Sequence, residues 1–397
     1  MQIPKEVTEI SPDVYWVGVR DWDRKMFDKL IPLPEGTTYN AYLLKGSEKS
    51  ALVDTVNPGF EHDLEDKVST LMDPADLDYI VMNHAEPDHA NGMKHMLSLS
   101  SKAKVLTTEK GVQMAQSLYH IEEDRFSPVE DEEKIDLGDK TLQFLHAPWL
   151  HWPETMLTYY EEEKILFPCD FFGAHIASTK LFAKDLDEEI IPHAKSYFGE
   201  IMMPFRPRVK SALDKLEDYD IKMIAPSHGV IHDNPEDILT AHRDWAEGKV
   251  KKKVLVPYIS MWGSTKKIVE TLVDTIAAEG IDVMPFDIVS RSLTEVAGEL
   301  VDSAGIILGS PTVLAGPHPQ MTYLASLAQK LNPPARYLGV VESHGWAGGA
   351  VRELSKVAEK MNGEVLGAIE VHGSPRDEDL EKVVKFGQDF AGKIKRL

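Results

Sequence analysis

The sequence predicts an α/β protein that contains two different sheet architectures. Residues 1–250 hold many short apolar runs joined by short polar turns, which is typical of antiparallel strands covered by helices. Residues 251–397 alternate apolar runs of strand length with helical patterns, which is typical of a doubly wound parallel sheet. The pattern changes at the basic segment Lys249–Lys253. We therefore expect a first domain over 1–250 and a second over 251–397.

Strands and a few helices are both predicted in the first domain. The candidate strands, in chain order, are VYWVGV, YNAYLL, ALVDTV, YIVMNH, KVLTT, TLQFLHA, MLTYY, ILFPCD and KMIAPSH. Helical patterns occur between some of them, for example over Glu61–Met72 and His193–Lys215. This mixture predicts two sheets with helices on their outer faces.

The second domain is predicted to contain a parallel sheet of about five strands. The candidate strands are VLVPYI, DVMPFDI, AGIILGS, YLGVVES and EVLGAIEV. Helical patterns separate them over Thr265–Glu279, around Met321–Leu331 and over Gly348–Met361, and a last helix is expected over Asp377–Lys395.

Composition excludes several classes of function. The formal net charge of −22 disfavours a nucleic acid or an anionic membrane as partner. The single cysteine, Cys169, excludes an intrachain disulfide and a cysteine-based zinc or iron–sulfur site, and it fits the cytoplasm. We interpret it as a buried residue at a strand end. No signal peptide or membrane span is expected, because no apolar stretch has the required length.

Potential metal ligands are concentrated in the segment Asn83–Gly92, NHAEPDHANG, which follows an apolar run of strand length. Four such side chains occur within six residues: His84, Glu86, Asp88 and His89. No single helix face unites them, so we expect a tight loop at a strand end. A polar surface loop with two histidines is the alternative.

Three later residues strengthen the metal hypothesis. His151 lies between two tryptophans in APWLHWPE, Asp170 ends the apolar run ILFPCDFFG, and His228 ends KMIAPSHG. Each one alone could be a core residue with satisfied hydrogen bonds. Together with the first segment they predict a metal centre at one shared rim of the sheets.

The joint pattern resembles a known family. The metallo-β-lactamase superfold begins its ligand set with His-x-His-x-Asp-His, whereas this sequence has Glu86 in place of the second histidine. With LHWP, Asp170 and SHG, the pattern resembles the flavodiiron proteins over essentially the whole chain. The resemblance implies an N-terminal metallo-β-lactamase-like αββα sandwich and a C-terminal flavodoxin-like doubly wound parallel sheet.

The resemblance also implies a pair of iron ions. One iron would bind His84, Glu86 and His151, the other Asp88, His89 and His228, and Asp170 would bridge them. The added carboxylate makes the donor set rich in oxygen, which suits iron better than zinc. The implied reaction is reduction of O2 to water, of NO to N2O, or of both, with electrons relayed through FMN.

A flavin site is expected at the ends of three strands in the second domain. The segment YISMWGST is either a phosphate cradle at a helix N-terminus or only a helix cap. GSPTVLAGPHPQ and SHGWAGGA follow two further strands and shift the interpretation towards a flavodoxin-like site. The FMN-binding residues implied by this resemblance are Ser260, Met261, Trp262, Gly263, Ser264, Thr265, Pro311, Thr312, Leu314, Ser343, His344, Gly345, Trp346, Ala347 and Gly348. Many relatives have asparagine where this chain has Leu314.

Two residues outside the ligand set, Tyr197 and His175, are candidates for the substrate pocket by the same resemblance. A half-buried helix tyrosine is the alternative for Tyr197. Many relatives have a pocket histidine in the segment corresponding to Arg20–Leu30, where this chain has none, and Asp28 is expected in its place.

The resemblance implies an external electron donor, either rubredoxin or reduced coenzyme F420, and a head-to-tail homodimer or a dimer of dimers. Two other functions remain open from the sequence. One is a zinc hydrolase of the lactamase superfold fused to a flavodoxin, which would require that Glu86 binds no metal. The other is an electron carrier with a degenerate metal site.

Overall fold

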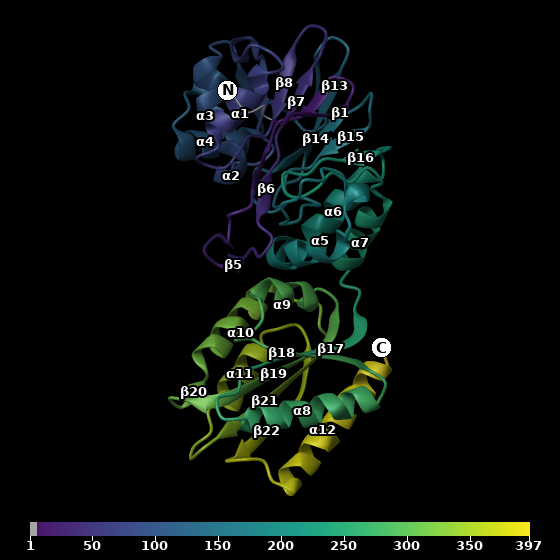
Figure 1. The fold of residues 1–397 in the computed structure, drawn as a ribbon. Helices are drawn as coiled ribbons and strands as arrows, with labels where there is room; N and C mark the ends of the chain where they lie inside the picture. The colour runs from purple at the N-terminus through teal and green to yellow at the C-terminus, as the bar shows by residue number, and fades with distance from the viewer. Residues whose placement is uncertain (1–5) are drawn as a thin grey trace. The chain divides into compact units, whose positions relative to one another are not determined.

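A computed structural model of the protein describes residues 6–397 (Figure 1). The chain forms two compact units. Unit 1 comprises the chain up to Ala194 together with Pro207–Arg243, and unit 2 comprises Lys195–Arg206 with Asp244–Leu397. A boundary between two domains near residue 250 stays a prediction.

The larger sheet of unit 1 has seven strands in the order β1-β2-β7-β8-β9-β10-β11. Their bounds are Thr8–Ser11, Val14–Trp16, Tyr42–Lys45, Ser50–Val53, Tyr79–Val81, Lys104–Thr107 and Phe126–Pro128. The first four strands pair antiparallel, and the pairs from β8 to β11 are parallel. Parallel pairs need crossover connections. These contain α1, α2, α3 and α4, over Glu61–Ser69, Pro87–Ala90, Gly92–Leu99 and Glu109–Tyr119.

The second sheet of unit 1 has the order β12-β13-β14-β15-β16. Its strands are Lys134–Asp136, Thr141–His146, Met156–Tyr160, Ile165–Phe167 and Met223–Ile224. The first four pair antiparallel, and β15 pairs parallel with β16. Two small ribbons complete the strands: β3 (Val19–Asp21) with β6 (Thr37–Tyr39), and β4 (Met26–Phe27) with β5 (Ile31–Pro32).

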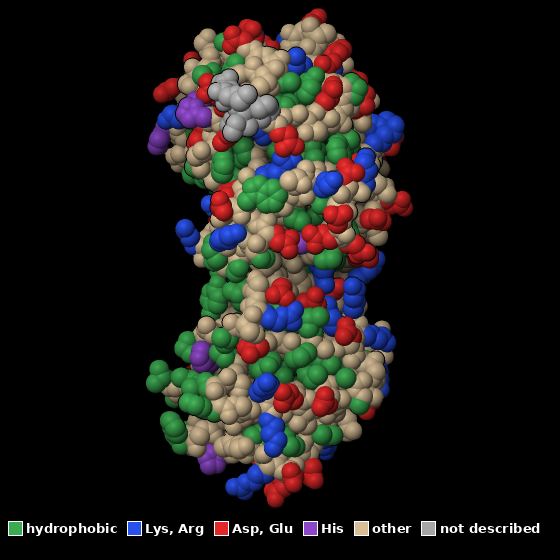
Figure 2. Space-filling view, viewed as in Figure 1, with side chains coloured by type: hydrophobic (Ala, Val, Ile, Leu, Met, Phe, Trp, Pro, Cys, Tyr) green, Lys and Arg blue, Asp and Glu red, His purple; other side chains and the backbone are tan. Residues whose placement is uncertain are grey.

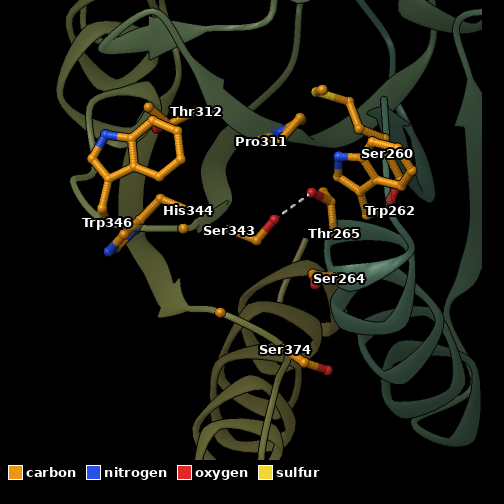
Figure 3. A pocket seen from close by; sticks show the side chains of 13 residues that line it. Ser260, Trp262, Ser264, Thr265, Pro311, Thr312, Ser343, His344, Trp346 and Ser374 are labelled. Carbon is orange, nitrogen blue, oxygen red and sulfur yellow. Dashed lines mark hydrogen bonds between the residues drawn. The ribbon is translucent and has the colours of Figure 1, made fainter.

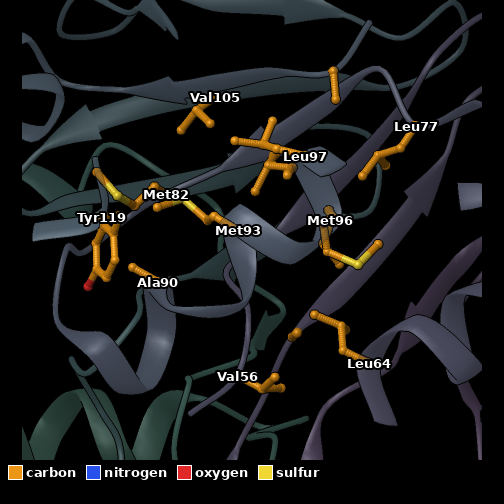
Figure 4. Close-up of a cluster of buried hydrophobic side chains, with 14 of the residues drawn as sticks. Val56, Leu64, Leu77, Met82, Ala90, Met93, Met96, Leu97, Val105 and Tyr119 are labelled. Atoms are coloured by element: carbon orange, nitrogen blue, oxygen red, sulfur yellow. The ribbon is translucent and has the colours of Figure 1, made fainter. Parts of the chain in front are cut away.

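Alternating residues of the larger sheet contribute to two different cores. Tyr42 and Val53 share a core with Phe144 and Phe167 of the second sheet, so the two sheets pack face to face. The neighbouring residue Leu43 belongs to the core on the opposite face. Figure 4 shows Leu64 of α1 and Met93 and Met96 of α3 in that core. Two packed sheets with helices outside them agree with the sequence-based prediction.

Two local predictions can be compared with the structure, and one of them is wrong. The tight loop expected from His84 to His89 instead enters the short helix α2, because Pro87 at its first position favours helix initiation. The helical pattern expected over His193–Lys215 is confirmed, although the type of helix changes within it. A π-helical turn (Phe198–Met202) and a 3₁₀ turn (Met203–Phe205) separate α5 (Ile191–Tyr197) from α6 (Arg206–Leu216), and Pro204 and Pro207 cannot donate backbone hydrogen bonds there. Helix α7 (Glu236–Ala246) follows.

Unit 2 contains the predicted parallel sheet, with five strands in the order β18-β17-β19-β21-β22. These strands are Asp282–Asp287, Lys251–Tyr258, Ser303–Val313, Tyr337–His344 and Glu364–His372. The short strand β20 (Gly316–Pro317) pairs antiparallel with the end of β19. The first strand in sequence lies next to the centre of the sheet, which is the doubly wound arrangement.

Five helices connect and cover the strands of unit 2: α8 (Ser264–Ala278), α9 (Leu293–Leu300), α10 (Pro319–Leu331), α11 (Ala350–Ala358) and α12 (Asp377–Lys395). Helices α8 and α12 pack against each other, as do α10 and α11 (Figure 1). Across residues 6–397, no helix has both the length and the apolar character needed to cross a bilayer.

Candidate functional site

Four predicted metal ligands face one another in unit 1, and we call them site A. His84 and Glu86 follow β9, His151 lies between β13 and β14, and Asp170 follows β15. His151 Nε2 lies 3.3 Å from Glu86 Oε2 and 3.2 Å from Asp170 Oδ2. His84 Nε2 lies 3.2 Å from the same Glu86 oxygen. Segments far apart in the sequence thus bring their donor atoms to one point.

Three further ligands form site B beside it. Asp88 and His89 belong to α2, and His228 follows β16. His228 Nε2 lies 3.2 Å from Asp88 Oδ2, and His89 Nε2 lies 3.4 Å from Asp88 Oδ1. All three side chains are buried.

The Asp170 carboxylate lies between the two sites. Its Oδ2 faces site A, at 3.2 Å from His151 Nε2. Its Oδ1 faces site B, at 2.9 Å from His89 Nε2 and 3.4 Å from His228 Nε2. One carboxylate can therefore offer one oxygen to each of two cations.

The donor atoms fit a pair of metal ions. Nitrogen and oxygen ligands about 2.1 Å from a shared metal, about 90–110° apart, lie about 3.0–3.4 Å from one another. Most of the donor–donor distances in the two sites are close to this range. Among residues 6–397, the two carboxylate oxygens of Asp88 and Nδ1 of His89 are buried without a hydrogen-bond partner. Buried polar atoms need partners, and bound cations would supply them.

The electrostatics of the cluster also favour cations. Burial alone would raise the pKa of Glu86, but hydrogen bonds from His151 and His84 outweigh it and lower the pKa to about 2. For Asp170, burial is likewise outweighed by the charge of His89 and by hydrogen bonds from His151 and His89, so its pKa is well below the usual range. Burial lowers the pKa of His151, whereas hydrogen bonds with Asp170 and Glu86 raise it to about 10. Glu86 and Asp170 therefore stay ionised, and their negative charge favours a proton or a metal ion on the neighbouring imidazoles.

Glu154 also belongs to this site, although the sequence analysis did not predict it. Its buried Oε1 accepts hydrogen bonds from His84 Nδ1 at 2.7 Å and from the backbone N–H of Ala85 at 2.8 Å. His84 is thereby oriented with Nε2 towards site A. The backbone carbonyl of Thr38 has the same role for His228, whose Nδ1 lies 2.6 Å away. A glutamate two residues before strand β14 was the available signal for Glu154.

Of the two predicted pocket residues, His175 lies beside site B. Its ring centroid is 4.9 Å from that of His228, and its Nδ1 is 3.0 Å from Thr37 Oγ1. Burial lowers the pKa of His175 well below its usual value, so the imidazole is neutral. Tyr197 is buried at the end of α5, and its role in the substrate pocket stays a prediction.

Asp28 and Cys169 both have raised pKa values, for partly different reasons. Burial and the charges of Glu86 and Asp88 raise the pKa of Asp28, which therefore feels the field of both metal sites. Cys169 is buried next to Asp170, and burial raises the pKa of its thiol well above the usual value. A protonated, buried thiol is a poor nucleophile, which suits the structural interpretation of Cys169.

Unit 2 has a pocket of about 330 Å³ at the carboxyl ends of its parallel strands (Figure 3). Eleven predicted flavin residues line it: Ser260, Met261, Trp262, Ser264, Thr265, Pro311, Thr312, Ser343, His344, Gly345 and Trp346. Gly373 and Ser374, after β22, also line the pocket and were not predicted. Four residues that were predicted do not line it: Gly263, Leu314, Ala347 and Gly348. A volume of this size is within the range of small-molecule sites.

One end of this pocket is built to receive an anion. Helix α8 begins at Ser264 after the N-cap residue Gly263, and Ser260 Oγ accepts a hydrogen bond from the backbone N–H of Lys266 at 3.2 Å. Gly263 has φ of 91°, so it shapes the turn before the helix rather than lining the pocket. Thr265 Oγ1 lies 2.8 Å from Ser343 Oγ, and this hydrogen bond joins the start of α8 to the end of β21 (Figure 3). The first backbone N–H groups of α8 and the helix dipole favour a phosphate here.

Glu342 was not predicted, although it holds two pocket loops together. It is fully buried at the end of β21. Its Oε1 accepts hydrogen bonds from the Thr312 hydroxyl and from the backbone N–H of Gly349, the latter at 2.9 Å. Its Oε2 accepts from the backbone N–H of Val351 at 2.6 Å. The loops after β19 and β21 are therefore linked through one carboxylate.

Large apolar side chains surround the mouth of the pocket. Trp262 is 91% exposed and Trp346 is 94% exposed, and Figure 3 shows them on opposite sides of the pocket. Leu314 is 97% exposed, and hydrophobic side chains project from unit 2 near β20 in Figure 2. Exposed aromatic groups at a pocket mouth are typical of ligand stacking or of a protein interface.

Sequence comparisons identify relatives of the whole chain. A family model described as ODP family beta lactamase matches residues 37–229. A nitric oxide reductase of Moorella thermoacetica is 35% identical over 392 residues, covering 97% of this chain and 98% of the relative. A coenzyme F420H(2) oxidase of Methanocaldococcus jannaschii is 32% identical over 410 residues, covering 98% and 97% of the two chains.

Solved structures of similar proteins match the described fold throughout. Rubredoxin oxygen:oxidoreductase from Desulfovibrio gigas superimposes with a TM-score of 0.95 at 28% identity, covering 98% of this chain and 99% of its own. The flavodiiron protein from Giardia intestinalis superimposes with a TM-score of 0.95 at 27% identity, covering 100% and 98%.

Proposed function

The chain belongs to the flavodiiron protein family, and we propose that it reduces O2, NO or both with electrons relayed through FMN. Its fold class, a metallo-β-lactamase-like sandwich with a flavodoxin-like parallel sheet, is the one that the sequence predicts. The observation that carries the reaction is the pair of buried donor sets that share Asp170. Two iron ions held there would supply the electrons and the binding positions for the diatomic gas.

We assign the ligands residue by residue as follows. His84, Glu86 and His151 would hold one iron, Asp88, His89 and His228 the other, and Asp170 both. Carboxylates supply three of these seven side chains, a share that suits iron and is unusual for zinc. The low pKa of Glu86, about 2, keeps it available as a ligand over the whole physiological pH range.

Hydrogen bonds with neighbouring groups would hold two of the histidine ligands in position. Glu154 orients His84, and the Thr38 carbonyl orients His228, so that each imidazole presents Nε2 to the metal. The neutral His175 would line the gas-binding side of site B without adding charge. Tyr197, buried at the end of α5, would be a pocket residue with a hydroxyl donor.

The pocket of unit 2 would hold FMN. Ser264 and Thr265, at the start of α8, would bind the phosphate through hydroxyl and backbone donors. Trp262 and Trp346 would flank the isoalloxazine ring, whose faces stack well on indoles. We retain Gly263, Leu314, Ala347 and Gly348 as residues that shape the surrounding loops.

The partners follow from the same surfaces and from the names of the relatives. Rubredoxin or the reduced deazaflavin coenzyme is the proposed electron donor, since each occurs in the name of a similar protein. The exposed Trp262, Leu314 and Trp346 favour a second copy of the chain over the flavin edge, in a head-to-tail homodimer or a dimer of dimers. The free thiol Cys169 suits the cytoplasm, the proposed location.

The proposal is tested on protein produced with ample iron and purified without oxygen. We expect two irons and one FMN per chain, and rapid reoxidation of the reduced flavin when O2 or NO is mixed in a stopped-flow instrument. Zinc at the seven positions together with ester or thioester hydrolysis would support the hydrolase alternative. A reduced protein that neither gas reoxidises would contradict the reductase function.

A further inference from the structure

A third group of potential metal ligands lies on the surface of unit 1, apart from sites A and B. His62 and Glu65 belong to α1, and His95 belongs to α3. His62 Nδ1 lies 3.1 Å from Glu65 Oε2, and His95 Nε2 lies 2.8 Å from the same oxygen. Figure 2 shows histidine side chains gathered on the surface over these helices.

The geometry points to a separate site for a divalent transition-metal ion, and we propose that His62, Glu65 and His95 bind Zn²⁺. Two imidazoles and one carboxylate are a known zinc donor set, and a fourth position remains for water. The two nitrogen–oxygen distances are within a few tenths of an ångström of the about 3.0–3.4 Å expected for ligands of one ion. The two rings are close and nearly perpendicular, with centroids 4.8 Å apart and planes at 79°.

A cluster held only by hydrogen bonds is the alternative. Glu65 can accept from both imidazoles, and these hydrogen bonds lower its pKa. An ion has room here, because a surface cavity of about 410 Å³ opens beside the two imidazoles, although Glu65 does not line it. His62 and His95 both line this cavity, together with Asn91 and His120.

An ion at this position would connect two helices next to the iron ligands. Helix α3 follows α2, which contains Asp88 and His89, and Asn91 between them donates to Glu61 of α1 at 2.5 Å. Metal binding at His62, Glu65 and His95 would therefore hold α1 against α3 more firmly. The site is open, since the His62 side chain is 84% exposed, so the ion would exchange with solution. This inference does not rest on the proposed reductase activity.

The test is a calorimetric titration of the iron-loaded, FMN-containing protein with Zn²⁺. We expect one zinc ion to bind per chain while the iron content stays constant. His62→Ala and His95→Ala should each weaken zinc binding by at least about tenfold. His120→Ala is the matched control, because His120 lines the same cavity outside the three-residue cluster, and it should bind zinc like the wild type.

Three outcomes would overturn the proposal. The first is absence of zinc binding by the wild-type protein, and the second is binding that occurs only as iron is released. The third is a loss of affinity in His120→Ala equal to that in His95→Ala. Circular dichroism of each variant shows that it is folded, and a lowered iron content in His62→Ala would itself contradict a separate site.

Discussion

Sites A and B of unit 1 differ from the pocket of unit 2 in burial and in the kind of side chain that each uses. Sites A and B are buried, and ionised side chains from distant segments converge on each other across about 3 Å. The pocket of unit 2 is open and uses hydroxyls, backbone N–H groups and exposed aromatic rings. A few irreplaceable contacts should therefore govern metal binding, whereas flavin binding should be spread over many weaker contacts.

The largest effect is expected for Asp170→Ala, because this carboxylate faces both metal sites. The variant should lose iron from both sites, and turnover should fall by more than about a hundredfold. FMN content should stay at the wild-type level. Iron analysis and flavin absorbance measure the two contents, with Asp187→Ala as a surface-carboxylate control. Retention of both irons would contradict the bridging position.

A smaller loss is expected for Glu154, which contacts a ligand rather than the metal. Glu154→Ala should weaken iron retention about 10- to 100-fold, because the His84 ring is no longer oriented. Glu154→Gln keeps an acceptor oxygen and should lose less. The rate of iron release to a chelator measures the effect. Equal rates in the two variants would show that the hydrogen bond to His84 has no role.

Glu342 of unit 2 is also a buried carboxylate that acts by positioning its neighbours. Glu342→Gln removes the buried charge and one of the oxygen acceptors that join two pocket loops. We expect FMN affinity to fall about tenfold, as for loss of hydrogen bonds to a charged group, with unchanged iron content. Flavin fluorescence on dilution measures the dissociation constant. A variant with wild-type affinity would show that the loops hold their positions without this carboxylate.

A single pocket hydroxyl should matter less. Thr265→Ala removes one hydrogen bond, and a typical net value of about 1 kcal/mol predicts FMN affinity reduced about fivefold. Iron content and the stability of unit 1 should not change. Equal loss of iron and FMN in this variant would mean that the two sites are not separate.

The last prediction concerns stability rather than ligand binding, at a buried carboxylate whose pKa is shifted chiefly by burial. Burial raises the pKa of Glu200 in unit 2 to about 8, although a hydrogen bond with Thr294 opposes the shift. The folded state then binds more protons than the unfolded state between the ordinary pKa of 4.5 and about 8. Stability should be highest at the acid end of this window and fall as the pH rises through it.

Chemical unfolding at a series of pH values, comparing wild type with Glu200→Gln, isolates this contribution. The free energy of unfolding of the wild type should decline more steeply with pH than that of the variant. Parallel curves would show that Glu200 is ionised in the folded protein at neutral pH. Glu86 and Asp170, which have imidazole neighbours, shift in the opposite direction, so the neighbours rather than burial alone decide the charge.

Much of the candidate metal site could be predicted from the sequence, because its ligands directly follow apolar strands. His84, Asp170 and His228 occupy strand ends that meet at one rim, and alternating strand and helix patterns indicated the parallel sheet of unit 2. Local sequence determines such features, since strand length, polarity and turn residues are local properties.

Other features depend on contacts between residues that are distant along the chain, so the local sequence gives only weak evidence for them. Glu154 is connected to the site through hydrogen bonds from His84 and Ala85, 70 and 69 residues away along the chain. Segment Lys195–Arg206 belongs to unit 2, whereas the chain returns to unit 1 at Pro207. No change in composition marks these two points, where the chain passes from one unit to the other. Ser374 lines the pocket of unit 2 only because β22 lies at the edge of the sheet, next to β21.

The central claim is that a single carboxylate holds two irons as a coupled pair. Mössbauer spectroscopy of the ⁵⁷Fe-loaded, oxidised protein in an applied field tests it most directly. A bridged pair predicts two irons per chain with a diamagnetic, spin-coupled ground state. Magnetically split spectra of isolated ferric ions, or fewer than two irons bound at the seven side chains, would contradict the claim.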